Sequence, residues 1–283
     1  MQGYADDTCI LHTTDLTNLQ YTQEMVNRDL SALTVYAEHH GLSLNEKKSC
    51  AMVFCSRRKR TMVESNLRLN VGGDELVFSE RVLLLGLHID VDLRFRYHVG
   101  QLFQKTYAKI KILYANKHIL DVNLKKRLTE SFVLSQFNYA LVSYYFRLDV
   151  MTKNRIQKVQ NICCRFSLGL RKYDRVSAKI KELGWLKMEY LARVHFLVMV
   201  HKILISSVPF YLRQKLVCRS DLHSVNVRNE SLLALPMHFT ALYRRCFTYN
   251  AVKLYNSIDP GFKKMSVLVF KKRLKLYYFN CIT

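Results

Sequence analysis

The sequence has little of what interrupts secondary structure, because its 283 residues include only 3 prolines and 9 glycines. Both residue types break helices and mark turns, so their scarcity predicts long helices and few turns. Hydrophobic residues make up 49% of the chain, which is too large a share for an intrinsically disordered protein. A chain of this length can bury one large core or two modest ones.

The sequence also lacks an apolar run long enough to cross a bilayer. Its longest strongly apolar window, Ser131–Phe146, contains Gln136 and Asn138 and is shorter than the roughly 20 residues that a spanning helix needs. No secretory leader is recognisable, because Asp6 and Asp7 stand where its basic and apolar parts would lie. We therefore expect no membrane partner and an intracellular protein, in the nucleus or the cytoplasm, that is not secreted.

The 8 cysteines form no C-x-x-C pair, which argues against a zinc knuckle or ribbon. In a protein without a secretory leader, these cysteines are expected to be reduced thiols.

Acidic residues are scarce relative to basic ones, with 22 against 44 and a net charge of +22. The imbalance is uneven: residues 1–56 hold 3 basic and 7 acidic residues, whereas residues 57–283 hold 41 basic and 15 acidic residues. An acidic start before a long basic body indicates metal chemistry beside a polyanion, and nucleic acid is the natural polyanion. The alternative is a solvated basic surface with no partner.

The first part of the chain is predicted to combine short strands with one long helix. A hairpin over residues 1–11 precedes a helix from about Thr17 to His40, which Asp15 caps and Gly41 ends. Further strands are expected over Cys50–Cys55, over Leu67–Val71 and Glu75–Phe78 around a turn at Gly72–Asp74, and over Val82–Asp90. The basic run Arg57–Arg60 between them suits a nuclear signal, a phosphate contact or a solvated loop.

From about Val99 onward the apolar spacing changes from strand-like to helical. The first helix has a predicted apolar face of Val99, Leu102, Phe103, Thr106, Tyr107, Ile110 and Leu113. Further helices are expected over Asn123–Phe146, Lys153–Leu168, Val176–Leu183, Lys187–Ser206, Arg244–Ser257 and Ser266–Tyr278. The predicted fold class is α+β, with a strand-containing part at 1–95, a helical part at 96–206 and a helical C-terminal part at 207–283.

The segment Tyr4–Asp7 reads Y-A-D-D within an apolar flank. Two adjacent carboxylates at a tight turn between strands can hold a divalent cation. Paired aspartates in turns are also common structural residues, so this motif alone is weak.

Several segments, taken in order, resemble the reverse transcriptase of non-LTR retrotransposons of the LINE type, most like the Jockey group. They are Tyr4–Asp7 (the palm Y-x-D-D hairpin), Leu42–Ser49 (G-L-x-L-N-x-x-K-T), Leu85–Asp90 (the primer grip), Ile156–Asn161 (I-Q-x-x-Q-N), Leu183–Leu186 (L-G-W-L), Leu254–Ile258 (L-W-N-S-[LI], here with Tyr255 for tryptophan) and Phe270–Lys275 (F-K-x-x-L-K). Their order and spacing along nearly the whole chain are more specific than any one of them.

The resemblance implies a palm remnant over 1–95, a thumb over 96–206 and a further helical region over 207–283. The implied reaction is RNA-directed DNA synthesis, in which two divalent metals about 4 Å apart activate the primer hydroxyl and stabilise pyrophosphate. The implied cofactor is Mg²⁺ or Mn²⁺, and the implied partners are an RNA template and a DNA primer. The fingers and the first palm aspartate precede the Y-x-D-D in this family, so we expect the isolated chain not to polymerise.

The resemblance also assigns roles to individual residues. Asp6 and Asp7 would be catalytic carboxylates and metal ligands, and Lys48 would neutralise the triphosphate or donate a proton to pyrophosphate. Tyr4 would pack against the primer end, and Gly86 would let the backbone approach the primer.

The chain's own pattern adds a candidate phosphate track on the thumb helices, where lysines alternate with Tyr107 and Tyr114. Its nucleic-acid contacts would be Lys105, Lys109, Lys125, Lys126 and Arg127. Two further hypotheses stay open beside a polymerase fragment: a non-catalytic basic module that binds RNA or an RNA–DNA hybrid, and a functionless transposon remnant.

Overall fold

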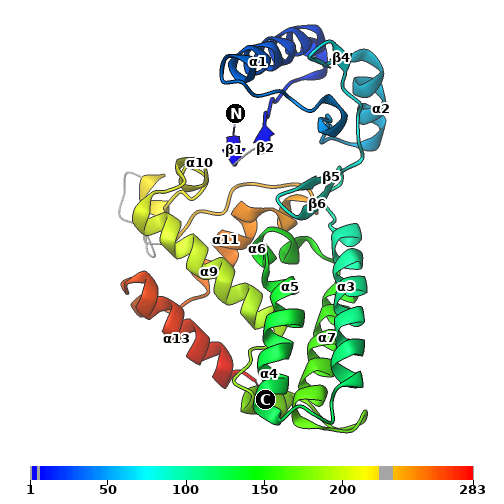
Figure 1. The fold of residues 1–283 in the computed structure, drawn as a ribbon. Helices are drawn as coiled ribbons and strands as arrows, with labels where there is room; N and C mark the ends of the chain where they lie inside the picture. The colour runs from blue at the N-terminus through cyan, green and yellow to red at the C-terminus, as the bar shows by residue number, and fades with distance from the viewer. Residues whose placement is uncertain (1, 5–6, 223–231, 283) are drawn as a thin grey trace. The chain divides into compact units, whose positions relative to one another are not determined.

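The computed structural model describes residues 2–4, 7–222 and 232–282 of the chain. The chain forms two compact units, Met1–His98 and Val99–Thr283 (Figure 1), and each is described by itself. Strands occur as small antiparallel two-stranded sheets among the described residues, and helices dominate. The structure therefore agrees with a general α+β class.

The expected N-terminal hairpin is present in the first unit. Strand β1 (Gln2–Tyr4) pairs with β2 (Asp7–Cys9), which places Tyr4 opposite Asp7. The second strand ends at Cys9, earlier than the expected Leu11.

The long helix of this unit is α1 (Leu19–His39), which follows the short 3₁₀ helix η1 (Leu16–Asn18). The expected cap by Asp15 is wrong, because its side chain accepts no capping hydrogen bond. The expected stop at Gly41 is confirmed: its φ is +69°, and the next N–H, that of Leu42, donates to Ala37 O at 2.9 Å. This bond and the left-handed conformation of Gly41 close the helix in a Schellman motif.

A small core of Leu69, Val71 and Leu76 holds α1 against the short hairpin of β3 (Asn70–Val71) and β4 (Asp74–Glu75). The amide of Asn27 on α1 bonds the edge of β3 in both directions, donating to Arg68 O and accepting from Asn70 N at 3.0 Å each. This hairpin confirms the predicted turn at Gly72 and Gly73, although its strands are shorter than expected.

Two strand predictions for this unit are wrong. Cys50–Cys55 forms no strand, since only Ala51 makes an isolated bridge, to Phe78. Val82–Asp90 is not one strand but a hairpin of β5 (Arg81–Leu84) and β6 (Leu87–Asp90).

The basic run Arg57–Arg60 begins a helix, α2 (Arg57–Asn66), instead of a loop. Arg60 is buried within it, and its guanidinium bonds Asp92 Oδ1 at 3.0 Å and Cys55 O at 3.1 Å. Arg60 therefore stabilises the unit itself, whereas its three basic neighbours are exposed.

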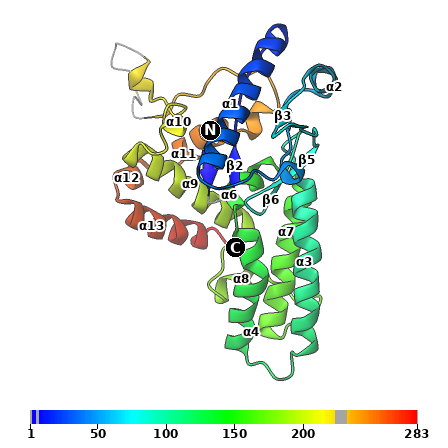
Figure 2. The ribbon, with the colours of Figure 1, turned by 45° about the horizontal axis from the view of Figure 1, so that its top comes forward.

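The second unit is helical throughout its described part (Figures 1 and 2). Helix α3 (Arg96–Ala115) starts at the boundary and runs beside α7 (Val150–Leu168), where Arg155 lies 4.4 Å above the ring of Phe103. The predicted apolar face of α3 is buried except at Tyr107, which is 44% exposed. The predicted helix Lys153–Leu168 is confirmed by α7, which Asp149 caps and Gly169 ends.

The expected single helix Asn123–Phe146 is wrong, because this segment is interrupted. It comprises α4 (Val122–Thr129), a π turn η3 (Glu130–Leu134), α5 (Ser135–Asn138), α6 (Leu141–Tyr144) and η4 (Tyr145–Arg147). The chain breaks at Ala140, whose φ is +49°. The break lets the buried Tyr144 hydroxyl donate to Phe137 O at 2.5 Å, which satisfies a polar group that would otherwise be costly to bury.

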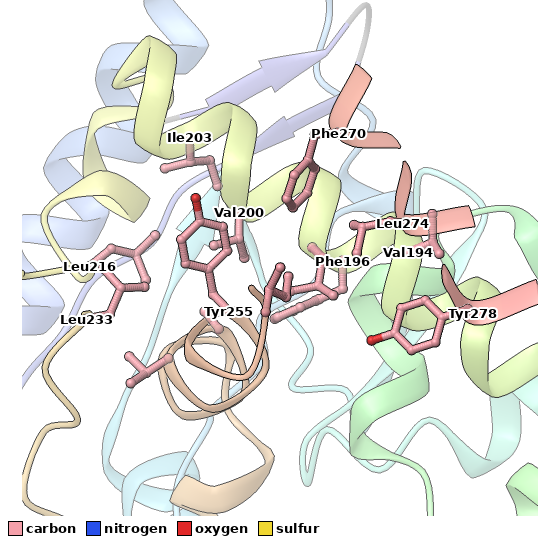
Figure 3. Close-up of a cluster of buried hydrophobic side chains, with 14 of the residues drawn as sticks. Val194, Phe196, Val200, Ile203, Leu216, Leu233, Tyr255, Phe270, Leu274 and Tyr278 are labelled. Atoms are coloured by element: carbon pink, nitrogen blue, oxygen red, sulfur yellow. The ribbon is translucent and has the colours of Figure 1, made fainter. Parts of the chain in front are cut away.

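A second core lies between α9 (Met188–Ser206), α11 (Phe247–Asn256) and α13 (Val267–Asn280) (Figure 3). Phe196, Tyr255, Phe270 and Leu274 are among its buried side chains. This core extends across the boundary expected at residue 206 and joins the helices on both sides of it. The remaining described elements are α8 (Ser177–Glu182), α10 (Phe210–Arg213), η5 (Arg219–Asp221), η6 (Tyr243–Arg245) and α12 (Pro260–Lys263).

Candidate nucleic-acid interface

The hairpin carboxylates are the first expected site. Asp7 begins β2 as an exposed residue, and Tyr4 opposite it is 68% exposed. Asp6 lies outside the described residues. Within the described residues, no three His, Cys, Asp or Glu side chains come together as metal ligands. Asp7 alone does not supply the near-octahedral oxygen set that Mg²⁺ demands, and a metal role for Asp6 and Asp7 stays a prediction.

Lys48 lies at the end of the 3₁₀ turn η2 (Glu46–Lys48). Asn45 fixes this turn, because its Oδ1 accepts the N–H of Lys48 at 3.1 Å. Asn45 therefore has a structural role, and Lys48 is exposed. A role for Lys48 beside a triphosphate stays a prediction.

A pair of carboxyl groups that the sequence did not suggest lies beside this turn. A hydrogen bond that protonated Glu46 donates to Asp74, together with the negative charge of Asp74, raises the pKa of Glu46 above its usual value. Gly72 makes room for the pair, since a Cβ there would lie 1.9 Å from Glu46 Oε1. The two glycines of the turn are visible in the sequence, but the distant Glu46 that folds over them carries no local signal.

Gly86 is the second residue of the β5–β6 turn. Its φ is +77° and that of Leu85 is +48°, the combination found in a type I′ hairpin turn. Glycine is therefore required here by the backbone of the turn itself. A close approach to a primer at this turn stays a prediction.

The basic residues of α3 lie on two different flanks of that helix. Each residue turns the helix by about 100°, so Lys105 and Lys109 share one flank, whereas Tyr107, Lys111 and Tyr114 share the other. Lys105 is exposed and Lys109 half-buried. The tyrosines therefore do not alternate with Lys105 and Lys109 along one face, and only Lys111 lies beside them.

Each basic residue of α4 has a different surrounding. Lys125 Nζ lies 6.0 Å above the ring of Phe166, and Lys126 Nζ lies 3.9 Å from Glu130 Oε1. Arg127 is exposed. Of the three, Lys125 is the one placed against an aromatic ring of α7.

Phe166 connects the end of α3, the start of α4 and the end of α7, which run together in both views (Figures 1 and 2). Its ring centroid lies 4.9 Å from that of Tyr114 on α3, and Lys125 covers it from α4. Burial raises the pKa of Tyr114, and the positive charge of Arg165 counteracts this. Tyr114, Lys125 and Arg165 therefore lie at the same end of the unit.

The loop after α7 folds back onto this end. The guanidinium of Arg165 donates to Asp174 O at 3.2 Å, and the N–H of Arg171 donates to Asp174 Oδ2 at 2.7 Å. On the other side the N–H of Lys117 donates to Tyr114 O at 3.3 Å. We name as the basic end the residues Tyr114, Lys117, Lys125, Arg165 and Arg171.

The basic end combines four cationic side chains with a partly exposed tyrosine ring, and the exposed Asp174 holds its loop. Cations that contact phosphates together with rings that contact bases are the usual elements of a nucleic-acid surface. The sequence predicted Lys125 in this surface, but Lys117, Arg165 and Arg171 were missed. Arg165 falls within a helix and Arg171 in a loop, and nothing local in the sequence joins them to Lys125.

Trp185 and His201 both lie in the interior of the helical unit. Trp185 is 7% exposed, and its Nε1–H donates to Glu130 Oε1 at 2.6 Å. His201 is fully buried between Tyr255 and Met265.

No protein-family model, curated protein or solved structure matches this chain. Among the residues that the structure describes, no helix combines the length and the apolar character that crossing a membrane requires.

Proposed function

We propose that this chain is part of the RNA-directed DNA polymerase of a LINE-type retrotransposon and holds the template–primer duplex at the basic end of its helical unit. The order of motifs along the sequence supports the family. Lys125 and Arg165 lie beside Phe166 and Tyr114, and backbone bonds place Lys117 and Arg171 at the same end, which supports the role.

The chemistry of the partner follows from that gathering. Each cation that neutralises a phosphate releases a counterion from the duplex, and this release dominates the affinity of such contacts. A net charge of +22 adds long-range attraction for any polyanion. Asp6 and Asp7 would contribute carboxylates to the metal centre of the same polymerase, as the resemblance implies.

The test is the salt dependence of binding to an RNA–DNA duplex, measured by fluorescence anisotropy. The paired substitution Lys117→Gln and Arg171→Gln removes two charges from the basic end, and both side chains are exposed. Since each phosphate contact contributes about 0.9 to the slope of log K against log salt, the slope is expected to become shallower by roughly 1.8.

The matched control is Lys202→Gln with Lys215→Gln, which removes the same charge from exposed positions near the end of α9 and after α10. The control pair is expected to leave the slope nearly unchanged. Equal changes in both pairs would show attraction by net charge without a binding surface.

The alternative of a basic binding module without a polymerase origin predicts the same slopes. Primer extension separates the two. This chain is added to a polymerase from which the corresponding segment has been deleted, and extension of the primer is measured. Restored Mg²⁺-dependent extension, lost again with Asp7→Asn, would support the polymerase. Binding without restored extension would support the module.

A further inference from the structure

A cavity of about 570 Å³ opens within the helical unit, a size typical of small-ligand sites. It lies between η3, α5, the loop after α8 and the start of α9, and the last turns of α13 form one of its sides. Its lining residues are Glu130, Leu134, Asn138, Gln160, Gly184, Trp185, Leu186, Met188, Leu191, Lys275, Leu276 and Phe279.

Buried hydrogen bonds hold the floor of the cavity in place. The bond from Trp185 Nε1 to Glu130 fixes the indole ring, and Gln160 Nε2 donates to Leu186 O at 2.9 Å. Gln157 Oε1 accepts the N–H of Met188 at 3.0 Å, where α9 begins. The aromatic floor is therefore formed before any ligand arrives.

Polar groups stand around this apolar floor. Asn138 and Glu130 line the cavity and are exposed residues, and Glu130 uses Oε1 in its bond to Trp185. The rim is cationic: Lys275 lines it, and Lys181 Nζ lies 5.4 Å above the ring of Phe279. Lys126 of α4 also lies at this rim, because its Nζ pairs with the carboxylate of Glu130.

We propose that this cavity binds one unpaired nucleobase of the nucleic acid, with the adjoining phosphates on Lys181 and Lys275. The base would lie against the rings of Trp185 and Phe279, since every base has a face that can stack on an aromatic side chain. Its edge would bond Asn138 and the carboxylate of Glu130. This inference rests on the proposed function, because it names the part of the same nucleic acid that leaves the duplex.

Charge and hydrogen bonding favour a base over an acyl chain as the occupant. An acyl chain offers no partner to Asn138, and its carboxylate head would meet the negative charge of Glu130. A base presents N–H donors that a carboxylate accepts, and its phosphates are attracted by the lysines of the rim. An unpaired base with its phosphate can therefore stack on the aromatic floor, bond the polar groups and pair with the lysines of the rim.

The experiment compares a blunt RNA–DNA duplex with the same duplex carrying a short single-stranded extension. Trp185 is the only tryptophan of the chain, so stacking of a base on it is expected to quench the intrinsic fluorescence with the extended duplex and not with the blunt one. The extended duplex is also expected to bind about tenfold more tightly, the usual effect of one stacked base.

Asn138→Ala and Phe279→Leu are expected to abolish both the quenching and the tenfold preference, while the affinity for the blunt duplex is kept. Tyr277→Ala is the matched control, because Tyr277 is an exposed aromatic residue of the same helix that does not line the cavity. Circular dichroism confirms that each variant is folded.

Three outcomes would overturn the base pocket, one of them together with the proposed function. Equal affinity for both duplexes without quenching overturns the base pocket and leaves the proposed duplex binding intact. A preference that persists in both Asn138→Ala and Phe279→Leu also overturns it. Failure of the wild-type protein to bind either duplex overturns the proposed function and the pocket together.

Discussion

At the scale of single residues, Arg60 differs from the three basic residues before it although all four belong to one short run. Its guanidinium is buried and bonds Asp92 and Cys55, whereas Arg58 on the same helix is exposed. Sequence alone treats the run as one cluster, because nothing in it identifies Asp92 as a partner. The structure assigns Arg60 to stability.

Arg60→Ala is expected to lower the free energy of unfolding of the first unit by roughly 1–3 kcal/mol, since it leaves the carbonyl of Cys55 and the carboxylate of Asp92 without their donor. Asp92 is 49% exposed, which places the effect toward the lower end. Arg58→Ala is the control and should change stability by less than about 0.5 kcal/mol. Urea unfolding followed by circular dichroism measures both, and equal effects would contradict the account.

His201 is a buried histidine held as a neutral ring. Met265 O can only accept, so Nε2 carries the proton, and Nδ1 then accepts from the hydroxyl of Tyr255; both distances are 2.9 Å. Burial lowers the pKa of His201, although the bond to Met265 opposes this. The unfolded chain therefore gains a proton at a higher pH than the folded one does.

Stability is consequently expected to be full above the unfolded pKa of about 6.5 and to fall as the pH decreases below it. The slope for one histidine is at most about 1.4 kcal/mol per pH unit. His195, whose pKa is lowered by burial, Lys271 and Lys275, adds to it. Urea midpoints measured across this range, with His201→Gln compared with His195→Gln, should show a weaker acid dependence in each variant. An unchanged acid dependence in His201→Gln would exclude the assigned role.

At the scale of elements, the β5–β6 hairpin has a strained turn. Leu85 occupies a positive φ that costs a leucine about 1–2 kcal/mol, and Gly86 occupies one without such a cost. Leu85→Asn is therefore expected to stabilise the first unit by a fraction of that amount, because Asn-Gly is the preferred type I′ pair. Gly86→Ala should destabilise it by about 1 kcal/mol. Thermal unfolding checks both signs, and two changes of the same sign would refute this turn.

Elements with strong local signals could be predicted from the sequence, and the others depended on distant contacts. Helices α7 and α9 follow an uninterrupted apolar spacing, and Gly41 ends α1 through its own backbone freedom. The break at Ala140 has neither glycine nor proline to mark it, and it exists because Tyr144 needs Phe137 O. The turn at Leu85 was missed for the same reason, because leucine is not a residue type that marks turns.

In the candidate site, too, some residues could be predicted from local signals and others depended on distant contacts. Lys125 could be selected from its position in a basic run, and the helix spacing of Lys105 and Lys109 was visible in advance. The placement of Arg165 and Arg171 at the same end as Lys125 depends on the fold, because Asp174 bonds both arginines and holds the loop on α7. The cavity lined by Trp185 likewise needs α13, whose residues come long after those of η3.

At the scale of the whole molecule, the division into two compact units predicts two unfolding transitions. The packed hydrophobic cluster of the first unit is small, with Leu69, Val71 and Leu76 buried in it, whereas the core beneath α9 is larger. The first unit is therefore expected to unfold at lower urea. Trp185, the only tryptophan, reports on the second unit alone.

Urea unfolding should accordingly show helix loss by circular dichroism beginning before the change in Trp185 fluorescence. Arg60→Ala should shift only the earlier phase. Coincident curves from both probes would instead show one cooperative unit.

The central claim concerns the basic end, and the salt dependence of RNA–DNA duplex binding tests it most directly. The wild-type protein is expected to lose affinity steeply as salt rises, and Lys117→Gln with Arg171→Gln to flatten that slope by roughly 1.8, while Lys202→Gln with Lys215→Gln leaves it unchanged. An affinity that does not depend on salt, or equal flattening by the two pairs, would contradict the claim.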